Sequence, residues 1–468
     1  MGSVIFDGNI ANNVKIAYIG GGSRGWARML MSDLAKAEDM NGSVALYDLD
    51  FEAAKCNEII GNRFNDLEGA KSKFTYTAVH TLAEALTGAD FVVISILPGT
   101  FEEMASDLNT PEKYGIYQPV GDSTGPGGVI RALRSIPMFQ EIARGVRDYC
   151  PDAWVINYTN PMTLCTAALY KEFPDIKAFG CCHEVFNTQN VLADAVRPHL
   201  PAGTQVTRRD IKTNVVGVNH FTWLTSARYR NIDLYPIYRE YIKDCKANRV
   251  PVVMDENWMN RAFKNDHSVK FDLFERYGII AAAGDRHLAE FCEGSWYLNS
   301  PKEVIETWHF CLTTAEWRKT HLKELLEKTE KILSGEEELK IVETGEEGVL
   351  QMRALLGLED LVTNVNIPNI GQIPNLPIGA VVETNASFRT DSVTPVMAGN
   401  VPTPIYNLIS RIVGEQMTVL EAAFNRDLEM AFRAFVNDPL VRLDVATARK
   451  LFDEMVENTK EYLTEYFK

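Results

Sequence analysis

The sequence has few cysteines, and it has no long apolar run. Eight cysteines among 468 residues are too few for a disulfide scaffold, so we expect each to be a small buried hydrophobe or a reactive or metal-binding thiol. No segment supplies the roughly 18 consecutive apolar residues of a membrane span. Residues 1–13 also lack the basic flank and apolar stretch of a signal peptide. These absences predict a cytoplasmic protein that does not enter a membrane.

Positive charge is also scarce. Lys and Arg total 47 against 63 for Asp and Glu, which gives a net charge of -16. Because this excess of negative charge repels phosphate backbones and anionic membrane surfaces, we exclude nucleic acid and membrane as partners. Hydrophobic residues make up 46% of the chain, a share typical of soluble enzymes. Composition alone indicates little more about the function.

Residues 14–200 alternate short β-rich runs with helical patterns, which predicts a parallel α/β sheet with both faces covered. We expect a Rossmann-type NAD-binding domain there. The predicted strands are Val14–Ile19, Val44–Tyr47, Phe91–Ile96, Trp154–Asn157 and Ala178–Gly180.

Residues 201–468 follow a different pattern, which predicts a second, α+β lobe. Asn214–Thr225 is predicted as a strand, whereas Trp308–Leu333 and Thr418–Phe435 have helical periodicity. Thr363–Ala386 is rich in Asn, Pro and Gly, and we expect it to be too irregular for one long element and too apolar for a free linker.

A glycine fingerprint, GGGSRG, directly follows the first predicted strand. Gly20 permits a tight turn, Gly22 lets the backbone approach a pyrophosphate, and Gly25 allows the next helix to pack closely. Together with Ser23, these residues are predicted to bind NAD at the helix N-terminus. The alternative is a glycine-rich turn without a ligand.

An acidic residue ends the second predicted strand. Asp48 lies where a carboxylate accepts hydrogen bonds from the adenosine ribose hydroxyls, which favours NAD over NADP. The nearby Asp50 is predicted to cap a helix that starts at Phe51.

Two further strand ends carry metal-binding residue types. Cys182 follows one short strand and His220 ends another apolar run. A thiolate and an imidazole, completed by substrate oxygens and water, suit a catalytic ion with open positions. The alternative for His183 or His220 is a hydrogen-bonded, half-buried imidazole. Spacing alone does not decide between a metal ligand and such an imidazole.

Several short motifs, taken together and in this order, resemble glycoside hydrolase family 4 from about residue 14 onward. Besides the fingerprint they are TGPGG (Thr124–Gly128), NYTNP (Asn157–Pro161), CHEV (Cys182–Val185), GVNH (Gly217–His220), GDRH (Gly284–His287) and NLP (Asn375–Pro377).

This resemblance implies a glycosidase that depends on NAD and on a divalent metal, commonly Mn2+, and that departs from the two-carboxylate scheme. NAD takes hydride from sugar C3, a base removes the C2 proton, the C1 oxygen leaves, water adds, and NADH returns the hydride. The metal binds the C2 and C3 oxygens as a Lewis acid. Cys182 and His220 are the implied ligands, although ligand softness alone favours zinc or iron.

The resemblance also suggests catalytic residues. Tyr277, paired with Asp272, is the implied C2 base, which requires a phenol pKa below its usual value near 10. The alternative is a core tyrosine. His183 is expected to protonate or orient the leaving oxygen, and Asn160 and Asn219 are expected to contact the sugar, with Asn160 also able to reach the nicotinamide.

Glu184 resembles the marker of the α-galacturonidase group. Relatives that read CHSV or CHGV act on neutral α-glycosides, so we expect an α-galacturonide substrate. Arg286 is the expected clamp for the C6 carboxylate, unless it pairs instead with Asp285 or Glu290.

Other functions stay open at this point. They include α-galactosidase, α-glucosidase and α-glucuronidase activity within the same family, an NAD-dependent 2-hydroxy acid dehydrogenase, and a non-enzymatic NAD sensor. The dehydrogenase does not need Cys182 together with His220. Family habit suggests a homodimer or homotetramer.

Overall fold

The computed structural model describes residues 4–249 and 266–468. Its centre is a ten-stranded sheet in the order β14-β13-β12-β7-β6-β5-β2-β3-β4, with β1 paired to β2. Six strands run parallel, as in a Rossmann-type fold. The strands from the N-terminal half are β1 (Ile5–Asp7), β2 (Ile10–Ile19), β3 (Met40–Tyr47), β4 (Phe74–Val79), β5 (Phe91–Ile94), β6 (Trp154–Asn157) and β7 (Lys177–Gly180).

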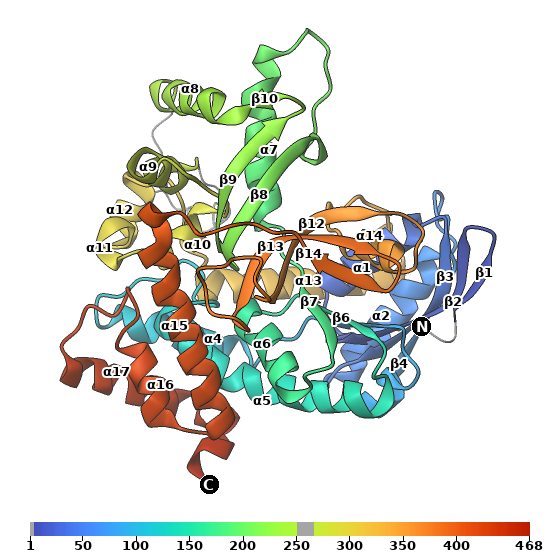
Figure 1. Ribbon diagram of the computed structural model, residues 1–468. Coiled ribbons are helices and arrows are strands. Elements are labelled where there is room, and N and C mark those ends of the chain that lie inside the picture. The colour runs from blue at the N-terminus through green and yellow to red at the C-terminus, as the bar shows by residue number, and fades with distance from the viewer. Residues whose placement is uncertain (1–3, 250–265) are drawn as a thin grey trace.

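The predicted α/β class and all five predicted strands are confirmed, with shifted ends for most of them. Alternate strand residues enter two separate cores, so both faces of the sheet are covered. In Figure 1, α5 and α6 lie below the sheet and α1 and α14 above it. The helices of this half are α1 (Trp26–Lys36), α2 (Phe51–Phe64), α3 (Leu82–Leu86), α4 (Phe101–Glu112), α5 (Gly125–Tyr149), α6 (Met162–Glu172) and α7 (Glu184–Val196).

Three strands from the end of the chain extend this sheet beyond β7. They are β12 (Leu361–Pro368), β13 (Val381–Arg389) and β14 (Ser392–Pro395), all antiparallel. The expectation that Thr363–Ala386 is too irregular for one long element is confirmed, because the segment divides into part of β12, a loop and part of β13. Pro368 ends β12, and the loop carries the other Pro and Gly residues of the segment. The sheet also crosses the expected division near residue 200.

A second sheet contains the hairpin of β8 (Ile211–Val218) and β9 (Phe221–Tyr229), with β10 (Ile232–Asp233) and β11 (Ile280–Ala281) beside it. The single strand predicted over Asn214–Thr225 is thus wrong. The chain reverses at His220, whose φ of 65° is left-handed. Hydrophobic alternation continues through such a turn, so it does not reveal the reversal.

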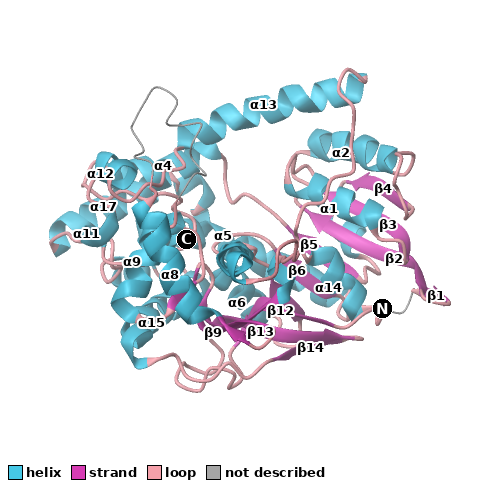
Figure 2. Ribbon diagram, turned by 90° about the horizontal axis from the view of Figure 1, so that it is seen from above, coloured by secondary structure: helices cyan, strands magenta, loops and turns pink. Residues whose placement is uncertain are grey.

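The remaining helices surround the second sheet and the C-terminal end of the molecule. The helix expected from Trp308 begins only at Ala315. The helical pattern over Thr418–Phe435 belongs to two helices, which are separated at Arg426. In Figure 2, α13 extends from these helices across to α2. The helices are α8 (Leu234–Ala247), α9 (Ser268–Tyr277), α10 (Asp285–Glu290), α11 (Gly294–Tyr297), α12 (Pro301–Glu306), α13 (Ala315–Ser334), α14 (Gly348–Leu355), α15 (Thr403–Asn425), α16 (Leu428–Phe435) and α17 (Val445–Asn458).

A buried ion pair joins α4 to α5. Arg134 Nη1 and Nη2 donate to the two carboxylate oxygens of Asp107 at 3.0 and 2.5 Å, and the side chains are 0% and 1% exposed. Because both charges have left water, each depends on the other for solvation.

Asp107→Ala should therefore destabilise the protein by about 3 to 5 kcal/mol, since it leaves the Arg134 charge buried and unpaired. The urea midpoint of unfolding measures this. Asp148→Ala, which removes an exposed pair with Arg147, is the matched control and should leave the midpoint unchanged. Equal midpoints for both variants would contradict the prediction.

Candidate active site

The fingerprint loop is shaped by close backbone contacts. Gly20 has a φ of +94°, and a Cβ there would lie 2.0 Å from the Ser95 carbonyl oxygen. Gly22 donates its N–H to Asp48 Oδ2 at 2.8 Å, and a Cβ on Gly22 would lie 2.9 Å from that same oxygen. These two glycines are thus required by the protein's own packing, which holds the Asp48 carboxylate at the end of β3.

Gly25 differs from the expectation. A Cβ on it would meet no atom within 4 Å, so it is not needed for helix packing. Gly25 is instead the N-cap of α1 and has no side-chain cap. Open space therefore lies before the helix N-terminus, where an anion is stabilised.

Two side chains support this loop. Asp50 accepts a hydrogen bond from Ala53 N at 3.1 Å, which confirms the predicted cap of α2. Asn57, buried and missed by the sequence reading, donates to the carbonyl oxygens of Gly21 and Ser23 at 2.8 and 2.9 Å. An isolated Asn within a helical pattern gave no signal of this role.

A cluster of three possible metal ligands lies beyond the carboxyl end of the parallel strands. Asp122, His220 and His287 are buried, and one ligand atom from each lies within 4.8 Å of the others. The two imidazole rings stack with centroids 3.7 Å apart. Ser123 Oγ and His220 Nδ1 form a hydrogen bond of 3.0 Å, which fixes the ring in the β8–β9 turn.

The protonation states of this cluster suit a cation. Burial lowers the pKa of His220, and burial together with His220 lowers that of His287 to about 3. Burial opposes ionisation of Asp122, but the neighbouring His220, His287 and Arg131 lower its pKa below the ordinary value. His287 Nδ1 is buried and has no hydrogen-bond partner among the described residues. Two neutral imidazoles and one carboxylate are ligands that a divalent ion such as Mn2+ accepts.

Cys182 lies outside this close group of described residues. Its carbonyl oxygen accepts a hydrogen bond from Asn364 at 3.3 Å, and its thiol hydrogen-bonds with Asn219, the neighbour of His220. Burial and the carboxylates of Glu383 and Glu184 raise the pKa of the thiol well above its ordinary value. A thiolate at this position therefore needs a cation beside it.

Glu184 links the cluster to the start of α10. Its Oε2 accepts the Gly284 N–H at 2.6 Å, and its Oε1 lies 3.8 Å from Nε2 of both His183 and His287. Burial opposes ionisation, yet His287, His183 and His220 lower its pKa to about 2. Because it is an anion, Glu184 is suited to orient imidazoles and is unsuited to contact a sugar carboxylate directly.

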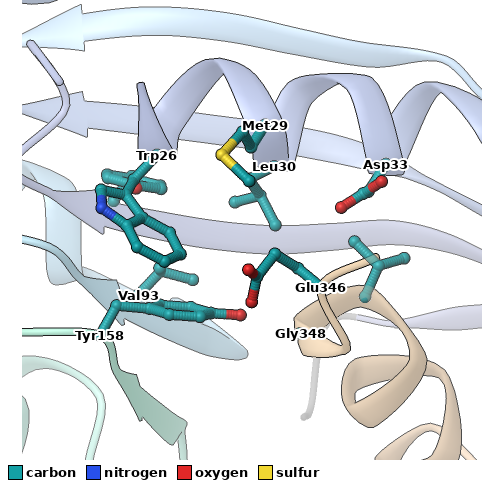
Figure 3. Close-up of a pocket in the computed structure, with 10 residues that line it drawn as sticks. Trp26, Met29, Leu30, Asp33, Val93, Tyr158, Glu346 and Gly348 are labelled. Atoms are coloured by element: carbon teal, nitrogen blue, oxygen red, sulfur yellow. The ribbon is translucent and has the colours of Figure 1, made fainter. Parts of the chain in front are cut away.

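His183 faces α1 and α14. Its Nδ1 lies 3.0 Å from Glu346 Oε1, and its ring stacks on Trp26 with centroids 5.9 Å apart. Burial lowers its pKa, but Glu346 raises it more, so the net shift is upward. A narrow pocket adjoins this pair, lined by Trp26, Tyr158, Glu346 and Asp33 among others; Figure 3 shows the Trp26 and Tyr158 rings next to one another.

The expected sugar-binding residues lie around the cluster. Asn160 donates to Asp122 Oδ2 at 3.2 Å and Asn219 to Glu383 Oε2 at 3.3 Å. The amide oxygens of both are buried and have no hydrogen-bond partner in the part of the chain that the structure describes. Arg286 donates to Thr313 Oγ1. Its electrostatic neighbours include Glu184, Asp122 and Glu290.

The structure gathers Tyr277 and Asp272 into a different group. Asp272 accepts a hydrogen bond from the Tyr297 hydroxyl at 2.6 Å. Its Oδ2 also forms an ion pair with Arg276, whose Nε lies 2.7 Å away. The Tyr277 ring meets Trp223 edge-on at 6.0 Å. Burial raises the pKa of Tyr277, which is the opposite of the change that a base needs.

The sequence reading missed Asp122 and His287 as members of the cluster, and Ser123 as the hydrogen-bond partner of His220. Asp122 and Ser123 directly precede the TGPGG motif, and His287 ends the GDRH motif. The motifs thus marked the correct segments, but spacing could not show which of their side chains converge.

Comparison with known proteins identifies the family of this chain. Residues 15–197 match the family 4 glycosyl hydrolase profile, and residues 215–441 match that of its C-terminal domain. The chain belongs to glycosyl hydrolase family 4. An alpha-galacturonidase from Thermoanaerobacterium saccharolyticum is 56% identical over 98% of both chains.

Solved structures of this family share the fold. A crystal structure from Bacillus subtilis has a TM-score of 0.88 at 52% identity and covers 95% of this chain and 100% of its own. A 6-phospho-alpha-glucosidase from gut microorganisms, solved with NAD and Mn2+, has a TM-score of 0.78 at 20% identity, covering 96% of this chain and 99% of its own. No described helix of this family 4 chain is long and apolar enough to cross a membrane.

Asp33, in the pocket beside Glu346, is expected to make the stability of the protein depend on pH. Burial raises its pKa from 3.8 to about 6, so between these values the native state keeps a proton that the unfolded chain has released. The free energy of unfolding therefore keeps the contribution of Asp33 below about pH 4 and loses it as the pH rises through about 6. Asp33→Asn should weaken the fall of the urea midpoint over this window. The exposed Glu338→Gln is the control, and identical pH profiles for wild type and Asp33→Asn would refute the assignment.

Proposed function

We propose that this protein hydrolyses α-galacturonides, with NAD and a divalent metal, commonly Mn2+, as cofactors. The observation that carries the proposal is Glu184 of the CHEV motif, buried as an anion between His183 and His287. The 56% identity to an alpha-galacturonidase over nearly the whole chain supports the same substrate class. A dehydrogenase of 2-hydroxy acids has no use for this arrangement.

The fingerprint loop is the proposed NAD site. Gly20, Gly22, Ser23 and Gly25 line the turn into α1, and the space at Gly25 admits a pyrophosphate. Asp48, held by two backbone N–H groups, would accept hydrogen bonds from the ribose. Bound NAD would supply reversible hydride removal at sugar C3.

Cys182 and His220 are the proposed metal ligands, with Asp122 and His287 as close neighbours that complete or orient the site. A bound divalent ion would supply Lewis-acid stabilisation at the C2 and C3 oxygens. The Ser123 hydrogen bond keeps His220 in place, and the free amide oxygens of Asn160 and Asn219 can accept hydrogen bonds from sugar hydroxyls.

His183 is the proposed acid for the leaving oxygen. Its raised pKa, maintained by Glu346, favours the protonated form that a proton donor needs. Tyr277 and Asp272 are not part of the proposed site, because they contact Trp223, Arg276 and Tyr297.

The compartment and assembly are also proposed. All eight cysteines are free thiols, which supports a reducing cytoplasm. Ile370, Ile378 and Met397 are 72%, 70% and 67% exposed, and backbone hydrogen bonds join the loops that carry them. This apolar surface supports a homodimer or homotetramer.

The metal ligands can be tested directly. Cys182→Ser and His220→Ala should each lose bound Mn2+, measured by metal analysis after gel filtration, and lose activity by several orders of magnitude. NAD binding, followed by calorimetry, should persist because the nucleotide loop is separate. Cys245→Ser, a half-buried thiol on α8, is the control and should keep its metal. A variant that keeps both metal and rate would remove that residue from the ligand set.

Substrate charge tests the function itself. Aryl α-galacturonides should be cleaved about tenfold to a hundredfold faster than matched α-galactosides, because a charge-assisted contact to the carboxylate adds about 1.5 to 3 kcal/mol. Arg286→Ala should mostly erase this ratio of kcat/KM. Arg389→Ala, which removes an exposed arginine, should leave it unchanged. Equal rates on the two sugars with the wild type would refute the uronide assignment.

A further inference from the structure

Arg318, on the first turns of α13, is a second arginine beside the cluster that no motif singles out. Its Nε is buried and has no hydrogen-bond partner. Across the described residues 4–249 and 266–468, its guanidinium forms neither a salt bridge nor a side-chain hydrogen bond. A buried guanidinium N–H without a partner is costly, so an anionic ligand would stabilise Arg318.

The geometry directs this side chain toward Arg286. Arg286 donates to Thr313 Oγ1, and Thr314, the next residue, is the N-cap of α13. Arg318 lies one turn further, with its N–H bonded to the Thr314 carbonyl. Long side chains in helices point back toward the N-terminus, so Arg318 extends over the turn that Arg286 contacts.

The same end of α13 is tied to the cluster. Thr313 N donates to the Pro119 carbonyl at 2.8 Å, and Pro119 begins the loop that carries Asp122. Asp122 and Glu290 are the acidic groups that face Arg318, and Arg131 and Arg286 are the basic ones. Three guanidinium groups therefore converge at one side of the cluster.

Positive charge exceeds negative charge there. Burial raises the pKa of Glu290 to about 8, so this carboxyl is protonated at neutral pH, and its Oε2 has no hydrogen-bond partner. Asp122 and Glu184 stay ionised. Asp122 is an electrostatic neighbour of all three arginines, and Glu184 is a neighbour of Arg286. The surplus matches one carboxylate on the substrate.

We propose that Arg318 binds the C6 carboxylate of the galacturonide together with Arg286, and so determines specificity for a uronide. This inference rests on the proposed function. Two guanidinium groups supply donors to both carboxylate oxygens, whereas a neutral C6 hydroxyl leaves Arg318 without a partner. Arg131 is already engaged, since its Nε donates to the Asn160 carbonyl at 3.0 Å.

The test compares Arg318→Met, Arg318→Lys and the control Lys319→Met in the enzyme loaded with NAD and Mn2+. Lys319 is the next residue on α13 but pairs with the exposed Glu102. We expect Arg318→Met to lower kcat/KM for the aryl α-galacturonide about tenfold to a hundredfold, with the α-galactoside value changed less than about twofold. Arg318→Lys should restore part of the loss, because it keeps the charge without the planar fork.

Binding of free galacturonate gives a second readout. Calorimetry should show weaker binding of galacturonate to Arg318→Met and Arg318→Lys, and unchanged binding to Lys319→Met. An equal loss on both glycosides would make Arg318 merely structural, and no loss on either would exclude it from the site; both overturn the inference while the proposed function stands. If the wild type itself fails to prefer the galacturonide, the proposed function fails first.

Discussion

The hydrogen bond between Ser123 and His220 joins two parts of the chain that are far apart in sequence, and the site depends on it. Ser123 belongs to a loop whose backbone is held by buried carboxyl groups from the other half: Glu290 accepts the N–H groups of Val120 and Gly121, and Asp438 accepts that of Gly125. Because these anchors are buried, the loop cannot move without losing several hydrogen bonds at once. The position of the imidazole is thus set by contacts beyond the site.

The buried carboxyl groups differ in how readily they ionise. Asp122 and Glu184 lie beside imidazoles and stay ionised, whereas burial raises the pKa of Glu383 to about 7 and that of Glu290 to about 8. The ionised pair provides negative charge for a cation and its imidazole ligands. Glu290 and Glu383 accept hydrogen bonds from backbone and amide groups. One residue type therefore serves two purposes, selected by its surroundings.

The sequence predicted what depends on local pattern. The parallel strands, the Asp50 cap and the tight turn at Gly20 follow from periodicity and stereochemistry, and the motifs marked the segments that form the site. Long-range convergence was not predictable. Hydrophobic alternation hid the reversal at His220, and the asparagines that face the site made β12 look irregular. No pattern in the sequence of α13 distinguished Arg318 from arginines on the solvent-exposed faces of helices.

The antiparallel extension of the large sheet has a consequence for synthesis on the ribosome. The edge of β7 is covered only when β12 pairs with it at Gly180 and Asn366, and β12 begins at residue 361. At about 5–20 residues per second, translation of the intervening chain takes on the order of ten seconds or more. During that interval the nascent protein exposes an open strand edge that other chains can pair with. Because β7 has four residues, it offers few backbone groups for such pairing.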